Sequence, residues 1–283
     1  MISAGAKRRG VPELPETETI ARDLDRAIRG ARITAVTVPR ADVLRAATAR
    51  VFQRALTGAT ITTVTRRAKS VVVQLGDDHH LVVTPRFTGA LLIGGPLTAP
   101  DVYDAIRFTL ADGRQLRYRD VRRLGTVTLL DSAAYEVWSE ALGPEPLDPA
   151  LNAAHFVAIV QGSRRAVKTI LMDQRRLAGI GNIYATEALW HARVAPSRAG
   201  AGLSAAAITR VFSALRTILP EAIAARGTTF RDYQDAHGGR GGYAEHLHAY
   251  GRAGLPCPRC ATLLATDHTL EGRRSVYCAR CQR

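Results

Sequence analysis

Four cysteines near the end of the chain constrain the fold more tightly than any other feature of the sequence. Cys257 and Cys260 form one Cys-x2-Cys pair, and Cys278 and Cys281 form a second pair after seventeen intervening residues. Each pair can direct two thiolates at the same metal ion, so together they supply the tetrahedral ligands of a zinc ribbon. We predict one structural Zn2+ ion, because a closed four-cysteine site leaves no coordination position open for catalysis. A redox or disulfide role fits less well, since the rest of the chain contains no cysteine.

The residues before a proline-rich linker at 142–149 have the pattern of short β-strands. Turn signals separate eight β-branched segments, at 32–38, 60–66, 70–75, 80–84, 90–93, 105–110, 115–118 and 125–130. This spacing favours an antiparallel sandwich or barrel over alternating strands and helices. A helix is expected to precede the first strand, starting at Pro15, because Ile20 and Leu24 recur at helical spacing. Gly30 suits the C-terminal end of that helix.

Beyond the linker the apolar pattern becomes helical, so we predict an α+β protein. Its parts are an extension at 1–11, a β-sandwich domain at 12–143, a helical domain at 150–250 and the zinc ribbon at 251–283. The longest helix is expected to run from a Ser204 cap to about Ala225, with Pro220 kinking or dividing it. Glycines at 234–243 predict an irregular loop that forms part of a binding pocket.

The charge of the chain narrows the choice of partner. Lysine and arginine total 39 against 25 acidic residues, which gives a net charge of +14. Such a protein usually binds a polyanion, because phosphate contacts release condensed counterions; a proteome that is basic throughout would give the same charge. No stretch approaches the ~20 consecutive apolar residues that span a bilayer, and residues 1–10 lack the apolar core of a secretory signal. We therefore expect a cytoplasmic protein that has no membrane partner.

Several residues carry no function that spacing alone can establish. Between two helical segments, Gly179 and Gly181 would let backbone amides and the Asn182 side chain approach a phosphate, although an ordinary helix–helix turn has the same pattern. Taken alone, Lys168 is expected to be a solvated charge. Phe87 and Leu124 are expected to be core residues on the same basis.

The run Pro-Glu-Leu-Pro-Glu-Thr-Glu-Thr, which begins at Pro12, resembles the start of the formamidopyrimidine-DNA glycosylase / endonuclease VIII family. Matching segments follow in the family's order at 66–69, 117–125, 142–147, 171–173, 179–187, 227–229 and 250–252, and end with the ribbon. The resemblance therefore covers the chain from Pro12 to its end, and Leu14 favours the formamidopyrimidine branch.

The resemblance implies a bifunctional DNA glycosylase and abasic-site lyase that removes oxidised or ring-opened purines from damaged double-stranded DNA. It assigns catalysis to the sandwich domain and DNA binding to the helical domain as a helix-two-turn-helix. It also implies a monomeric bacterial protein that is associated with the nucleoid. In this family the N-terminal proline attacks C1′ of the damaged nucleotide, and the resulting iminium permits β,δ-elimination. Pro12 matches this nucleophile and Glu13 the neighbouring acid/base carboxylate. Lys69 matches the lysine at the lesion and its flanking phosphate.

The resemblance also implies a set of DNA-binding residues. Glu16 matches a carboxylate near the flipped base. Asn182 and Arg273 match phosphate-binding positions, with Arg274 as the alternative to Arg273. The other members are Phe87, Arg122 and Leu124, which align with side chains that fill the vacated base stack, and the cations Lys168 and Arg231.

The chain departs from the family at its start, where eleven residues precede Pro12. An amide nitrogen inside a chain cannot form an iminium, so the mechanism requires a free amine at Pro12. We expect Val11 to be the true initiator, encoded by a GTG start codon. The alternatives are that the extension is removed, or that it is retained in a monofunctional or purely lesion-binding protein.

A second departure lies in the residues expected to fill the base stack. The family's His-Leu-Gly-Met-Ser-Gly stretch is Thr84-Pro-Arg-Phe-Thr-Gly89 in this chain, and the usual phenylalanine wedge is Leu124. An alternative is therefore a divergent enzyme for bulky or alkylated lesions. Two further alternatives are a catalytically silent protein that binds damaged DNA and a zinc-ribbon protein that binds RNA.

Overall fold

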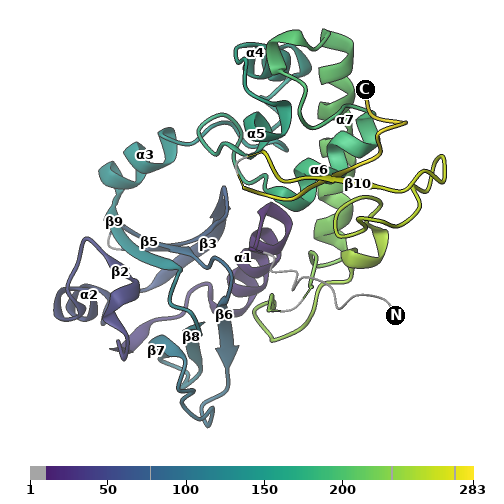
Figure 1. Ribbon diagram of the computed structural model, residues 1–283. Coiled ribbons are helices and arrows are strands. Elements are labelled where there is room, and N and C mark those ends of the chain that lie inside the picture. Colours follow the sequence, from purple (N-terminus) through teal and green to yellow (C-terminus); the bar gives the residue numbers. More distant parts are fainter. Residues whose placement is uncertain (1–10, 77, 231, 271) are drawn as a thin grey trace. The chain divides into compact units, whose positions relative to one another are not determined.

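The computed structural model describes residues 11–76, 78–230, 232–270 and 272–283 (Figure 1). The chain forms two compact units. Unit 1 comprises the residues up to Glu140 together with Ala225–Gly242, and unit 2 comprises Ala141–Ala224 with Tyr243–Arg283. This division differs from the one expected from the sequence, because Ala225–Gly242 belongs to the unit of the β-sandwich and not to the helical region at 150–250.

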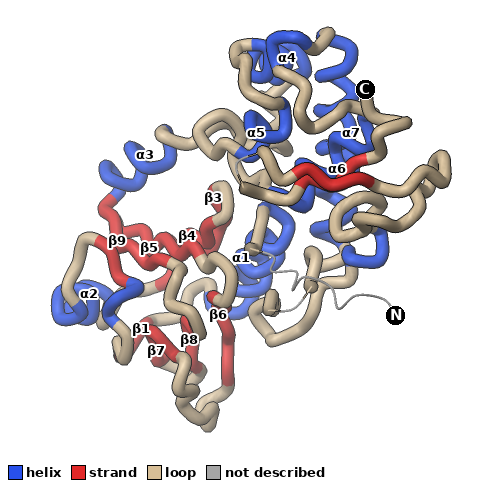
Figure 2. Tube along the Cα trace, viewed as in Figure 1, coloured by secondary structure: helices blue, strands red, loops and turns tan. Residues whose placement is uncertain are grey.

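Unit 1 contains two β-sheets, shown by the red segments of Figure 2. The first sheet has the strand order β1-β7-β8-β6, formed by β1 (Ile33–Thr37), β7 (Asp104–Leu110), β8 (Gln115–Asp120) and β6 (Gly89–Gly94). The second has the order β2-β9-β5-β4-β3, formed by β2 (Leu44–Arg45), β9 (Thr126–Asp131), β5 (His79–Thr84), β4 (Ser70–Leu75) and β3 (Ile61–Arg67). The predicted α+β fold with an N-terminal β-sandwich is confirmed. The pairing is antiparallel except between β2 and β9, which run parallel, a feature that the sequence did not predict.

One apolar cluster joins the two sheets with the first helix, α1 (Leu14–Ile28). Phe108 comes from one sheet and Val73 from the other, while Leu24 comes from α1, and all three are buried. The helix begins at Leu14, one residue before the predicted start at Pro15, and Gly30 after its end has the left-handed φ of +81°, as expected for that position. Asp25 fixes α1 to the edge of β3 by accepting from the backbone N–H of Val64 at 2.8 Å.

Two helices of unit 1 were not predicted, namely α2 (Ala49–Leu56) and α3 (Ser132–Glu140). In α2 only Phe52 and Leu56 are buried, and α3 has no buried residue. Such short helices carry too few apolar residues for a periodic pattern to appear in the sequence.

Unit 2 is helical apart from the ribbon. Its helices are α4 (Ala153–Gln161), α5 (Val167–Met172), α6 (Asn182–Ala192) and α7 (Ala205–Ala224), and its strands β10 (Ala265–Asp267) and β11 (Ser275–Tyr277) pair antiparallel. Short 3-10 turns occur at Ala41–Val43 in unit 1 and at Gly200–Gly202 and Tyr243–His246 in unit 2. Among the described residues, no helix combines the length and the apolarity needed to cross a membrane.

Helix α7 continues through Pro220, whereas the sequence favoured a kink or a break at this residue. Pro220 lies on the exposed face of the helix. The carbonyl of Arg216, four residues earlier, loses its helical donor on that same exposed face, where water can replace it. The apolar face, which includes Ile208, Leu215 and Leu219, stays buried across the whole length.

Candidate active site

The start of α1 forms a compact polar turn around two buried carboxylates. Glu13 is the N-cap residue, and it forms a capping box with Glu16, whose Oε2 accepts from the backbone N–H of Glu13 at 2.9 Å. The exposed fractions of Glu13 and Glu16 are 3% and 1%. Pro15 occupies the first turn, where its missing N–H costs nothing. This arrangement fixes the backbone that leads out of Pro12, which is itself buried.

The segment 225–242 packs against this turn in the same unit. The backbone N–H of Thr228 donates to Glu16 Oε1 at 2.6 Å, and the Tyr233 hydroxyl donates to the Glu16 carbonyl at 3.3 Å. Gly227 has a φ of +84°, and a Cβ at this position would lie 2.9 Å from Glu16 Cγ. Only glycine permits both this backbone conformation and this close approach.

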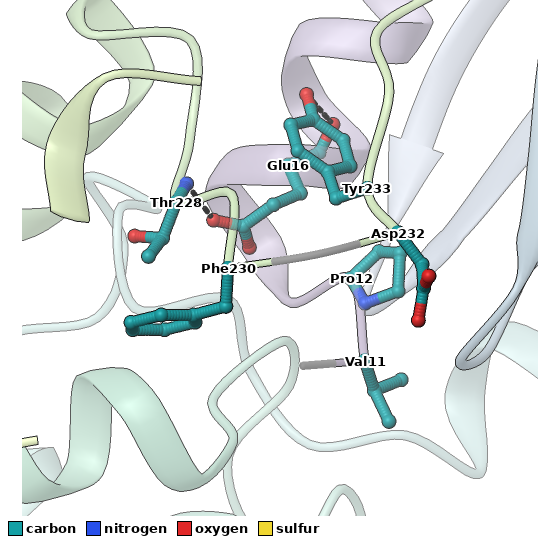
Figure 3. A pocket seen from close by; sticks show the side chains of 7 residues that line it. All are labelled: Val11, Pro12, Glu16, Thr228, Phe230, Asp232 and Tyr233. Atoms are coloured by element: carbon teal, nitrogen blue, oxygen red, sulfur yellow. Dashed lines mark hydrogen bonds between the residues drawn. The ribbon is translucent and has the colours of Figure 1, made fainter. Parts of the chain in front are cut away.

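A pocket opens where these elements meet, with Pro12 in its wall (Figure 3). Its lining residues are Val11, Pro12, Glu16, Thr228, Phe230, Asp232 and Tyr233. Burial, together with the nearby charge of Glu16, raises the pKa of Tyr233, so its hydroxyl stays protonated and serves as a donor. The glycine-rich stretch 234–243 was expected to form part of the pocket, but the residues of this region that line it, Thr228, Phe230, Asp232 and Tyr233, lie immediately before that stretch. Arg231 lies outside the described residues.

Lys69 lies in the tight turn between β3 and β4. Its neighbour Ala68 has a left-handed φ of +52°, and Arg66 braces the turn by donating to the Ala68 carbonyl at 3.0 Å. The guanidinium of Arg66 also donates to Glu18 of α1 at 2.8 Å. Burial raises the pKa of Glu18, but the charges of Arg66 and Arg22 outweigh it and the net pKa is lowered. The turn that carries Lys69 is therefore tied to the helix that follows Pro12.

The predicted stack-filling residues Phe87 and Arg122 are brought together. The guanidinium carbon of Arg122 lies 5.3 Å from the centre of the Phe87 ring. Phe87 lies in the segment 85–88 and Arg122 in the segment 121–125. Buried Asp120 connects these two loops, because its carboxylate accepts from the Thr88 hydroxyl at 2.6 Å and from the Gly125 N–H at 2.9 Å. Phe87 is half-buried, so it is not the core residue that its type alone suggests.

Leu124 lies in the same loop as Arg122, and its exposed fraction of 40% likewise excludes a core position. A large apolar side chain held on a structured loop at the surface is available for contact with a partner.

In unit 2, the predicted residues Lys168 and Asn182 meet at the ribbon. Lys168 Nζ donates to the Arg274 carbonyl at 3.2 Å and to Ser275 Oγ at 2.8 Å, while Asn182 Nδ2 donates to the same carbonyl at 3.3 Å. The exposed fraction of Lys168 is 1%, so it is not the solvated charge expected from the sequence. Its contacts instead position the backbone beside Arg273, whose side chain is exposed.

Glu187, which was not among the predicted site residues, organises the neighbouring loop. Its buried carboxylate accepts from three successive backbone N–H groups, those of His248, Ala249 and Tyr250, at 2.7–2.9 Å. Two signals in the sequence point to it: it is the one acidic residue of α6, and it ends the family-like segment 179–187. This loop leads directly into the ribbon.

The four cysteines of the ribbon converge as their spacing predicted. Their Sγ atoms lie within 4.8 Å of one another, and those of Cys260 and Cys278 are 3.4 Å apart. Four thiolates at this separation can hold one tetrahedral metal ion. A small apolar cluster supports the site, and it includes Trp190, Leu264 and Val276.

Both units match known families and known structures. The family model for the formamidopyrimidine-DNA glycosylase N-terminal domain matches residues 11–127, and that for the formamidopyrimidine-DNA glycosylase H2TH domain matches residues 142–234. A formamidopyrimidine-DNA glycosylase of Moorella thermoacetica is 44% identical over 88% of this chain and 92% of its own. One of Thermomicrobium roseum is 41% identical over 96% of this chain and 99% of its own.

Solved structures give the same result. A Lactococcus lactis FPG mutant in complex with DNA that contains Fapy-dG matches with a TM-score of 0.89 at 30% identity, over 96% of this chain and 100% of that one. The MutM (FPG) protein of Thermus thermophilus matches with a TM-score of 0.85 at 33% identity, over 96% of this chain and 98% of that one.

Proposed function

We propose, because this chain belongs to the formamidopyrimidine-DNA glycosylase family, that it excises oxidised or ring-opened purines from duplex DNA and then cleaves the strand at the abasic site. The observation that carries the proposal is the position of Pro12, which lines a pocket beside the buried carboxylates of Glu13 and Glu16. The relatives support the substrate class, since Lactococcus lactis structures hold DNA with Fapy-dG and DNA with an abasic site.

The proposed reaction starts with the amine of Pro12, which attacks C1′ of the damaged nucleotide. The base leaves with the electron pair of the glycosidic bond, and opening of the sugar ring gives an iminium between the proline nitrogen and C1′. The iminium acidifies the C2′ proton, whose removal expels the 3′ phosphate; a second elimination expels the 5′ phosphate. Glu13, next to the nucleophile, moves protons at the sugar, and Lys69 neutralises a phosphate that flanks the lesion.

DNA binding in this proposal uses both units. Asn182 and Arg273 contact phosphates, and a structural Zn2+ held by the four cysteines fixes the ribbon hairpin that carries Arg273. Lys168 supports that hairpin from within, through the Arg274 carbonyl. Phe87, Arg122 and Leu124 enter the gap that the flipped nucleotide leaves, and Arg231 adds a further cation. The enzyme acts as a cytoplasmic monomer.

The proposal requires Pro12 to be the first residue of the active chain, because only a free secondary amine can form the iminium. The family model begins to match at residue 11, directly before Pro12. We infer that the active form lacks residues 1–11.

Borohydride trapping on duplex DNA with one abasic site tests this proposal. Protein that starts at Pro12 should give a covalent adduct, and mass mapping should place the sugar remnant on Pro12. The intact 283-residue chain, verified by mass, is the matched control and should give none. A Pro12-started protein that gives no adduct, or an adduct on another residue, would refute the proposed mechanism.

A further inference from the structure

Arg226 stands at the entrance to the segment that lines the pocket, in a backbone conformation that favours glycine. Its φ is +62°, and Gly227 after it has a φ of +84°. The left-handed conformation is unfavourable for a residue with a side chain, because Cβ comes too close to the following carbonyl oxygen. Two such residues in succession produce the sharp turn that places the Thr228 N–H against Glu16. A long side chain at such a position calls for a compensating interaction.

That interaction is a pair of ionic contacts to two buried carboxylates. Nη2 of Arg226 lies 2.5 Å from Asp23 Oδ2 on α1 and 2.6 Å from Asp235 Oδ2, and Nε lies 3.0 Å from the same Asp235 oxygen. The side chains of Asp23 and Asp235 are 5% and 4% exposed. One planar guanidinium thus connects the helix that follows Pro12 with the far end of the pocket-lining segment.

Asp235 in turn organises the backbone beyond the pocket. Its Oδ1 accepts from the N–H groups of His237 at 3.0 Å and Gly239 at 2.7 Å. Burial raises the pKa of Asp235, but the hydrogen bond from Arg226 and these two N–H groups outweigh it, so the pKa is lowered. The carbonyl of Ala236 accepts from the N–H of Ile93 on β6 at 2.9 Å, which attaches the same turn to the sandwich. The pocket-lining residues Thr228, Phe230, Asp232 and Tyr233 therefore lie between two fixed points of the chain.

We propose that Arg226, Asp23 and Asp235 form a clamp that positions the wall of the pocket for the damaged base. This inference rests on the proposed function and assigns the clamp to one of its two steps. Base excision needs the wall formed by Thr228, Phe230, Asp232 and Tyr233, because the base must be held while Pro12 attacks. Strand cleavage at an abasic site involves no base, so it does not need that wall. Arg226 is a positioning residue, since it does not line the pocket.

The test compares two substrates under single-turnover conditions, using protein that starts at Pro12. One duplex carries a ring-opened purine and the other a preformed abasic site. Arg226→Gly keeps the backbone conformation and removes the clamp, so excision should slow by at least about tenfold, as expected for a misplaced wall. Cleavage of the abasic duplex should stay within about twofold of the parent rate. Arg226→Lys keeps the positive charge but not the forked guanidinium, so its excision rate should lie between those of the parent protein and Arg226→Gly.

Arg193→Gly is the matched control, because Arg193 also has a left-handed φ of +60° and an exposed side chain, and belongs to unit 2, whereas the clamp belongs to unit 1. This substitution removes one positive charge and one unfavourable left-handed side-chain position, as Arg226→Gly does. It should leave the rates of base excision and of abasic-site cleavage unchanged. Amide hydrogen exchange within 228–239 should accelerate in Arg226→Gly and not in Arg193→Gly. If Arg226→Gly does not fold, Asp235→Asn provides the same comparison.

The outcomes separate the two proposals. Unchanged excision by Arg226→Gly, or an equal loss of excision and abasic cleavage, would overturn the clamp. A parent protein that cleaves neither duplex would instead overturn the proposed function, and the clamp's role with it.

Discussion

Two segments of low regularity, residues 225–242 in unit 1 and the ribbon at 251–283 in unit 2, are held in place by different means. Segment 225–242 has no helix or strand among its described residues and relies on its neighbours in unit 1. It adds Tyr233 and Ala236 to the large apolar cluster of the sandwich, and Arg226 clamps it to α1. The ribbon instead has a separate cluster whose buried members include two of its own cysteines, Cys257 and Cys278.

The difference follows from how much apolar surface each segment can bury. A segment that shares a neighbour's core can shift locally without unfolding, because the core persists without it. A small module with its own minimal core needs a covalent or metal cross-link to fold. We therefore expect substitutions in 225–242 to reduce function while the free energy of unfolding changes little. Loss of the metal ligands should instead unfold the whole ribbon.

Removal of the metal should have the largest effect and should be confined to the ribbon. Structural zinc sites contribute ~10–16 kcal/mol in zinc-finger peptides, which exceeds anything that the ribbon's small core can supply. Chelation, or Cys278→Ser, should unfold the ribbon and weaken binding to duplex DNA about 100-fold, as the loss of two charge-assisted phosphate contacts predicts. Metal analysis should give one zinc per chain, and fluorescence anisotropy should report the affinity.

The sandwich provides the control for this experiment. Hydrogen exchange in β3, β4 and β5 should be unchanged after chelation, and added Zn2+ should restore DNA binding. Metal-free protein that binds DNA as tightly as the zinc form would show that the ribbon does not depend on the ion.

Gly227→Ala should have the next largest effect, confined to segment 225–242. The alanine would adopt a left-handed conformation at ~1–2 kcal/mol, and its Cβ would lie 2.9 Å from Glu16 Cγ, where overpacking adds ~1–3 kcal/mol. We expect excision to fall while thermal unfolding of the sandwich changes little. Gly238→Ala is the matched control, because Gly238 has a similar φ of +83° with nothing within 4 Å of the added Cβ. Equal loss of excision in both variants would contradict the contact with Glu16.

Much of this architecture could be predicted from the sequence. Every strand of the two sheets except the two-residue β2 was identified, because β-branched runs alternate with turn signals. The metal site was identified because Cys257, Cys260, Cys278 and Cys281 have ribbon spacing. The catalytic assignment of Pro12 came from family resemblance alone, since a proline beside acidic residues has no general signature.

The packing of segment 225–242 was not predictable in the same way. It depends on the contact between Arg226 and Asp23, which are 203 residues apart, and sequence spacing carries no information at that distance. Lys168 was misjudged for a similar reason, because its burial follows from Ser275, 107 residues later in the chain. Isolated charges are assigned to the surface by default, and only the folded structure supplies their partners.

Lys168→Met should have the smallest effect and should sharpen the contrast between the two segments. Methionine fills similar volume but leaves the Ser275 hydroxyl without the lysine donor. The Arg274 carbonyl keeps Asn182 Nδ2 as a donor at 3.3 Å, so the loss should stay near ~1 kcal/mol. Zinc release into a chromogenic chelator should accelerate by about fivefold, which is the ratio that ~1 kcal/mol corresponds to.

Ser275→Ala and the double variant complete a mutant cycle, and additive effects would show that Lys168 and Ser275 are not coupled. Faster zinc release with unchanged exchange in 225–242 would confirm that each segment is held by its own contacts.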